Sequence, residues 1–211
     1  MDADRAAAQL EVIRTLMERT ALYRRSLIPA TLVTGGLGAA AAVLAFALDL
    51  DQPRTFGLYW MAVAGVAMGA AFLLMRRQAM HDGEPFWSPP ARRVLQAALP
   101  AFTAGLTAAV VAVSSAAHPG VSIWWLPVVW MVLYGCALNA AGFFMPRGIR
   151  LFGWLFVLAG CALGSLLNAA GSAGTILAPV DAHLVMGGTF GGFHALYGLY
   201  LLQTRTHAPP P

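Results

Sequence analysis

Charged residues are what this sequence of 211 residues most lacks, since they make up only 10% of it. Ordinary soluble domains have about 25% charged residues. Lysine is absent altogether, while 59% of the residues are hydrophobic and the mean hydropathy is +0.68. Because so little polar surface cannot cover a particle that faces water, we expect most of the exterior to face lipid.

Cysteines and catalytic motifs are also scarce. The two cysteines, Cys136 and Cys161, lie inside apolar runs and in no CxxC or cysteine–histidine spacing, which argues against a disulfide framework and a structural zinc site. The sequence contains no GxSxG, HExxH, P-loop or strand-linked GxGxxG motif. No carboxylate or arginine lies clearly at membrane depth, as proton pumps and voltage sensors require. These absences favour a protein that is not an enzyme and needs no cofactor.

Six long apolar runs dominate what is present. Each has about the 20 residues that a helix needs to cross a bilayer, and none alternates as barrel strands do. We therefore predict an all-α polytopic membrane protein, a bundle of six transmembrane helices over residues 26–203. The predicted spans are residues 26–50, 56–75, 94–117, 121–145, 151–170 and 182–202.

The thirteen arginines predict the direction of these spans. Twelve lie before the first span, on alternate connectors or after the last span, and only Arg54 lies on the other side. By the positive-inside rule both termini are cytoplasmic, with residues 204–211 as a short tail and no nucleic-acid partner implied. Residues 1–25 contain no signal-peptide pattern and are predicted to form a cytoplasmic amphipathic helix. That helix could pack on its own protein, lie on the membrane, or bind a partner or second copy.

Small residues predict where helices approach closely. Each odd-numbered span has a small-residue patch after an arginine pair, which suggests three hairpin repeats or simply an alanine- and glycine-rich composition. GxxxG spacings favour close helix packing inside the bundle, with a homodimer face or a backbone-lined path as alternatives. The four pairs are Gly65/Gly69, Gly160/Gly164, Gly187/Gly191 and Gly188/Gly192.

His194, near the middle of the last span, is the main candidate for a polar site. A buried histidine in lipid must face the bundle and find a hydrogen-bond partner. The candidate partners are the side chains of Tyr134, Asn139, Asn168 and Thr189, or a backbone carbonyl. A hydrogen-bonded core histidine is the first interpretation, while a haem ligand and a proton relay remain open. His183 is about 16 Å away along a helix axis, too far to bind the same iron.

A second group of polar residues falls at the predicted outer surface. Imidazole together with carboxylate suits a divalent metal, although the spacing forms no known motif and Asp181 also suits a helix N-cap. The group comprises Asp49, Asp51, His118, Asp181 and His183. Tyr59 and Trp60, at the outer start of the second span, are typical of an interfacial aromatic belt.

Three stretches carry a resemblance to a known family. They are residues 13–20, the segment with Trp87, Arg92, Arg93 and Pro100, and residues 190–198. Together they resemble an uncharacterised family of small six-span bacterial membrane proteins. The resemblance implies a bacterial inner-membrane location and supplies no catalytic residues.

Three functions remain open on the sequence. The first is a non-enzymatic, partner-binding or regulatory membrane protein that contacts the lipid bilayer and a protein partner or further copies of itself. The second is a small-solute transporter or pore built from three hairpins. The third is a haem- or metal-binding redox protein that uses His194, or His118 with His183.

Overall fold

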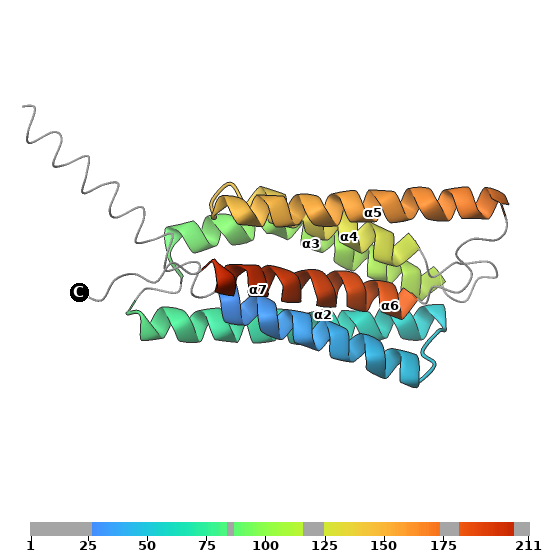
Figure 1. The fold of residues 1–211 in the computed structure, drawn as a ribbon, viewed down its shortest axis with the longest axis horizontal. Coiled ribbons are helices and arrows are strands. Elements are labelled where there is room, and N and C mark those ends of the chain that lie inside the picture. The colour runs from blue at the N-terminus through green and yellow to red at the C-terminus, as the bar shows by residue number, and fades with distance from the viewer. Residues whose placement is uncertain (1–26, 84–86, 116–124, 174–181, 205–211) are drawn as a thin grey trace, which may run out of the picture.

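The computed structural model of the protein describes residues 27–83, 87–115, 125–173 and 182–204, and within these ranges every regular element is a helix (Figure 1). The predicted all-α class is therefore confirmed. The helices run roughly along one common axis and form an elongated bundle (Figure 1). The helix predicted over residues 1–25 and most of the predicted tail lie outside the described residues.

The helices follow the six apolar runs in order. The first described helix is Leu27–Ala47. The next four are α2 (Pro53–His81), α3 (Pro89–Ser115), α4 (Trp125–Ala141) and α5 (Arg147–Ala173). The last run forms α6 (Ala182–Met186), the π-helix η1 (Gly187–Phe193) and α7 (His194–Gln203), which continue directly into one another. We call these three together the sixth segment.

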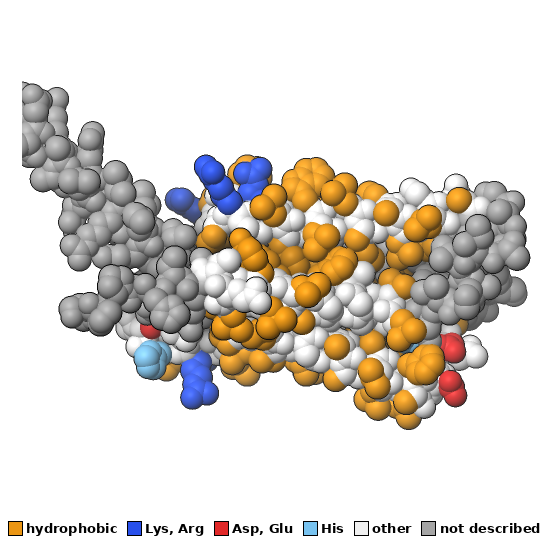
Figure 2. All heavy atoms as spheres, viewed as in Figure 1, with side chains coloured by type: hydrophobic (Ala, Val, Ile, Leu, Met, Phe, Trp, Pro, Cys, Tyr) orange, Lys and Arg blue, Asp and Glu red, His pale blue; other side chains and the backbone are white. Residues whose placement is uncertain are grey.

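Four helices are long and apolar enough to cross a membrane, namely the first helix, α2, α3 and α5. The helix α4 is apolar but has only 17 residues, and the sixth segment is divided by the π-helix. Charged side chains of the described residues gather at the two ends of the bundle (Figure 2). Apolar and small residues cover the length between those ends.

The connector between α2 and α3 explains why both helices exceed their predicted spans. Arginine is a good helix former, so α2 continues through Arg76 and Arg77 beyond the apolar run. The helix ends just before Gly83, whose φ of +69° suits glycine. Because proline is tolerated in the first turn of a helix, α3 begins at Pro89, before its apolar run starts.

The sixth segment packs against the first helix with backbone touching backbone. A Cβ added at Gly38 would lie 2.9 Å from the amide nitrogen of Gly191, and one added at Gly191 would lie 2.6 Å from that of Ala39. The two helices are antiparallel, since Gly35 meets Ala195 while Gly38 meets Gly191. Only glycine permits such a close approach, which the packing of helices in lipid commonly uses.

The helices α4 and α5 make a second contact of the same kind. A Cβ on Gly135 would stand 2.6 Å from the carbonyl oxygen of Gly153, and a Cβ on Gly160 would stand 2.9 Å from the side chain of Val132. Buried Met131, Phe152 and Phe156 form the core beside this contact. These helices therefore place their aromatic side chains against the sixth segment.

Candidate functional site

His194 is the most buried polar group in the middle of the bundle, with 3% of its surface exposed. Its Nδ1 lies 2.7 Å from the carbonyl oxygen of Phe190, one turn earlier in the same segment. Its Nε2 lies 2.7 Å from the hydroxyl of Tyr134 on α4. Because a carbonyl only accepts, Nδ1 carries a hydrogen, and in the neutral imidazole Nε2 then accepts the hydrogen bond from Tyr134. Both ring nitrogens are thus occupied by hydrogen-bond partners inside the chain.

Aromatic rings enclose this histidine. The ring of Phe152 stands edge-on at 5.1 Å between centroids, and those of Tyr134 and Phe156 lie at 5.4 and 5.6 Å. Phe152 in turn stacks on Tyr197 at 4.5 Å. These contacts join α4, α5 and the sixth segment around one imidazole, in surroundings that disfavour a charge.

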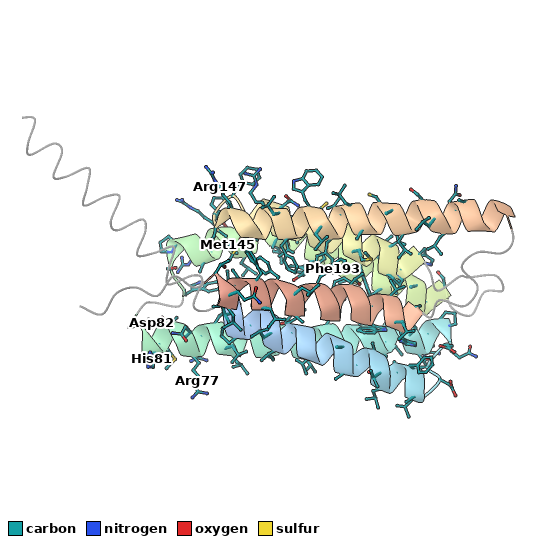
Figure 3. All side chains as sticks on the ribbon, viewed as in Figure 1. Arg77, His81, Asp82, Met145, Arg147 and Phe193 are labelled. Atoms are coloured by element: carbon teal, nitrogen blue, oxygen red, sulfur yellow. The ribbon has the colours of Figure 1, made fainter. Side chains whose placement is uncertain are left out.

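The π-helix immediately precedes His194. Its i→i+5 turns cover the sequence Gly-Gly-Thr-Phe-Gly-Gly-Phe, in which Gly187 and Gly191 are the buried residues that face the first helix. The carbonyl of Phe190, inside the π-helix, is the acceptor for His194 Nδ1. Figure 3 shows Phe193 near the middle of the bundle, where its ring packs 5.3 Å from that of Phe156.

A second buried histidine lies at the start of the sixth segment. His183 is 1% exposed, and its Nδ1 accepts a hydrogen bond of 2.9 Å from Trp60 Nε1. Its Nε2 therefore carries the hydrogen and points to the carbonyl oxygen of Leu50 at 3.2 Å. The carboxylate of Asp51, 72% exposed, is 3.8 Å from the same nitrogen. This arrangement ties the sixth segment to α2 and to the connector after the first helix.

The structure brings one of the four proposed partners to His194. Tyr134 is that partner, whereas Asn139 donates to the carbonyl of Gly135 and Thr189 to that of Val185, both on their own helices. Asn168 is an exposed residue near the far end of α5.

The residues of the predicted metal site are only partly described. Asp51 and His183 are neighbours, and Asp49 adopts a positive φ of 48° at the turn after the first helix. His118 and Asp181 lie outside the described residues. Within the part of the chain that the structure describes, no group of three potential metal ligands comes together.

Glycine pairs divide into two kinds. Gly160 and Gly164 contact α4, and Gly187 and Gly191 contact the first helix. The other pairs differ from the predicted packing. Among the described atoms, none lies within 4 Å of a Cβ added at Gly65, Gly69 or Gly188, and Gly192 meets only an oxygen of its own segment. Gly65, Gly69 and Gly188 are exposed. A GxxxG spacing places two glycines on one face of a helix, but it does not say whether that face is turned toward the bundle or away from it.

Sequence reasoning missed the partner of His183. Trp60 was expected in an interfacial belt, yet it is 2% exposed and donates to His183. Its neighbour Tyr59 donates to the carbonyl of Ala41 at 2.6 Å. The sequence placed both the indole of Trp60 and the imidazole of His183 near the same predicted surface. Their spacing along the chain, however, does not show that the two side chains meet.

The geometry limits the chemistry of His194. Binding a metal through His194 Nε2 would require displacement of the Tyr134 hydroxyl, and proton uptake there would turn an acceptor into a second donor.

Comparisons with protein-family models, with curated proteins and with solved structures find no match for the chain.

Proposed function

We propose that the chain is an integral protein of the bacterial inner membrane that crosses it six times, with both ends in the cytoplasm. Four helices of sufficient length and apolarity support this proposal. Six described arginines gather at the end that would be cytoplasmic, as the positive-inside rule requires. The resemblance to a six-span bacterial family supports the same location. The protein should remain in the membrane pellet at alkaline pH and need detergent to dissolve; release by alkali alone would contradict the proposal.

Within that membrane, the function that we propose is binding of a protein partner rather than catalysis. One observation carries the proposal: the buried polar side chains of the described residues, Thr31, His183 and His194, all have hydrogen-bond partners inside the chain. Groups already engaged in this way serve packing, so the surfaces left for function are the exposed ends. In the sequence, residues 1–25 precede the first helix at this inner end, and binding of a partner or a second copy is one of the three roles open to them.

Site-specific crosslinking tests this proposal. A photo-crosslinking residue replaces His81, whose side chain is 84% exposed at one end, and in a matched control it replaces Asp51, 72% exposed at the other end. We expect one adduct of defined mass from position 81 and none from position 51. An adduct of twice the chain mass would identify a homo-oligomer.

Deleting residues 1–25 should reduce the yield of the position-81 adduct if that segment contributes to the contact. Equal labelling from both ends, or no adduct at all from position 81 in intact cells, would contradict the proposal.

Small-solute transport is the second candidate, and the π-helix favours it. Turns of this kind are rare and often occur at functional sites, and many transporters bind their solutes at interrupted helices. Cysteines placed at Asn139, Asn168 and Thr189 should then react with a water-soluble thiol reagent. The test uses a background without Cys136 and Cys161, which are both exposed. Three unreactive positions would rule out a water-filled path beside them.

A further inference from the structure

The two ends of the bundle differ strongly in charge. Six arginines and one aspartate among the described residues lie at the inner end, where Figure 3 labels Arg77, Asp82 and Arg147. Asp49, Asp51 and Arg54 lie at the other end, around the connector from the first helix to α2, where Figure 2 shows acidic side chains. The inner end therefore has a surplus of positive charge that a negatively charged surface or ligand would neutralise.

Arg150 is held in position at this end. A Cβ on Gly142 would overlap the Cγ of Arg150, so the aliphatic part of this arginine lies directly on the backbone of the α4–α5 connector. Its guanidinium stands 4.6 Å above the ring of Phe143, which is 71% exposed. The charge is thus fixed beside an exposed aromatic ring instead of extending freely into water.

An apolar strip runs along α5 from these arginines. Arg147, Leu151, Trp154 and Leu158 follow one another at intervals of four, three and four residues, so they share one helix face. Leu151, Trp154 and Leu158 are 72%, 52% and 62% exposed. Trp154 lies about 10 Å along the helix axis from Arg147. A cationic end followed by an exposed apolar strip matches the build of a phospholipid, in which a phosphate is followed by acyl chains.

We propose that Arg147 and Arg150 bind the phosphate of an anionic phospholipid whose acyl chains lie along Leu151, Trp154 and Leu158. The inference rests on the proposed membrane location. Guanidinium groups bind phosphate oxygens through charge-assisted hydrogen bonds, often in pairs. A zwitterionic headgroup brings its own cation and gains less from the same arginines. Free phosphate has no apolar group that could contact the strip, so the strip favours a lipid as the source of the phosphate.

Native mass spectrometry of the detergent-solubilised protein tests this inference with phosphatidylglycerol and phosphatidylcholine as probes. We expect preferential adducts with phosphatidylglycerol. The double variant Arg147→Gln/Arg150→Gln should lower that binding by roughly tenfold or more, because it removes the charge-assisted hydrogen bonds that both guanidinium groups donate to the phosphate. The matched control Arg76→Gln/Arg77→Gln removes the same charge from α2 and should change binding by no more than about twofold.

A further variant separates a lipid from free phosphate. Trp154→Ala keeps both arginines and should weaken phosphatidylglycerol adducts without altering any binding of inorganic phosphate. Equal losses in the two arginine pairs, equal binding of the two lipids, or displacement of the lipid by millimolar phosphate would each overturn the inference. Circular dichroism checks that all variants remain helical. A protein that dissolves without detergent would refute the membrane location itself, a result seen before any lipid is added.

Discussion

The imidazole of His194 is held in one tautomer by two hydrogen bonds on opposite sides. Phe190 accepts from Nδ1, and Tyr134 donates to Nε2. The pair forms a polar link between α4 and the sixth segment inside an otherwise apolar core. Hydrogen bonds of this kind between membrane helices contribute about 0.5–2 kcal/mol, and leaving a buried acceptor unpaired adds to the loss.

The first residue-scale prediction concerns this link. Tyr134→Phe removes the donor and should lower the free energy of unfolding by about 1–2 kcal/mol. His194→Phe removes the acceptor as well, so the double variant should cost less than the sum of the two single variants. Unfolding in mixed detergent micelles measures the cycle. Additive losses would mean that the two side chains do not interact.

The second residue-scale prediction compares two glycines. Gly191→Ala places a methyl group 2.6 Å from the amide nitrogen of Ala39, so it must push the sixth segment from the first helix. We expect a loss of about 1–3 kcal/mol. The control Gly65→Ala meets no described atom within 4 Å and should be neutral or stabilise the helix by up to about 1 kcal/mol. Thermal unfolding midpoints decide, and similar shifts for both variants would contradict the contact.

At this scale the sequence predicted which polar residues are buried better than it predicted which side chains contact each other. It identified His194 and offered Tyr134 among four partners, because a buried imidazole in lipid needs one. It did not pair Trp60 with His183, since the rotation of each helix about its axis decides which side chains meet. For the same reason the spacing of Gly65 and Gly69 did not decide between packing inside the bundle and an outward face, and in the structure both residues are exposed.

At the scale of elements, the sixth segment is unusual because it is not one continuous α-helix. The sequence predicted its extent closely, from residue 182 to 202, but gave no indication of seven π-helical residues within it. In an unbroken α-helix, His183 and His194 would share one face, since eleven residues complete about three turns. The wider π turns change this register, and the two histidines contact α2 and α4 respectively.

The prediction at this scale is a deletion. Removing Gly188, which contacts no described atom at its Cβ position, shortens the π-helix by one residue and rotates one half of the segment by about 100°. One histidine should then lose its partner, and the yield of folded protein should fall sharply. Gly188→Ala keeps the register and should fold normally. Fluorescence-detected gel filtration compares the two, and an unaffected deletion variant would contradict the role of the register.

At the scale of the whole molecule, the distribution of charge predicts the two sides of the membrane. Cysteine at Asp51 should react with an impermeant maleimide at the outer surface, whereas cysteine at His81 should react only after the inner side is opened. Both variants are made without Cys136 and Cys161. The reverse pattern, or reaction of both positions from one side, would contradict the proposed orientation.

The all-α class could be predicted from composition and pattern together, because the few charged residues imply a lipid-facing surface and the long apolar runs do not alternate as barrel strands do. The end of each helix was less predictable. Pro89 begins α3 and Arg76 continues α2, because neither residue type stops a helix at those positions.

The contacts of the sixth segment are the last to form during protein synthesis. The ribosome makes this segment after the five helices around it, so in the proposed membrane topology Trp60 and Tyr134 enter the bilayer before their imidazole acceptors exist. Until then their polar hydrogens must find temporary acceptors. The nascent bundle therefore remains incomplete until its last helix arrives, and a chain interrupted before residue 182 should be an early substrate for membrane proteases.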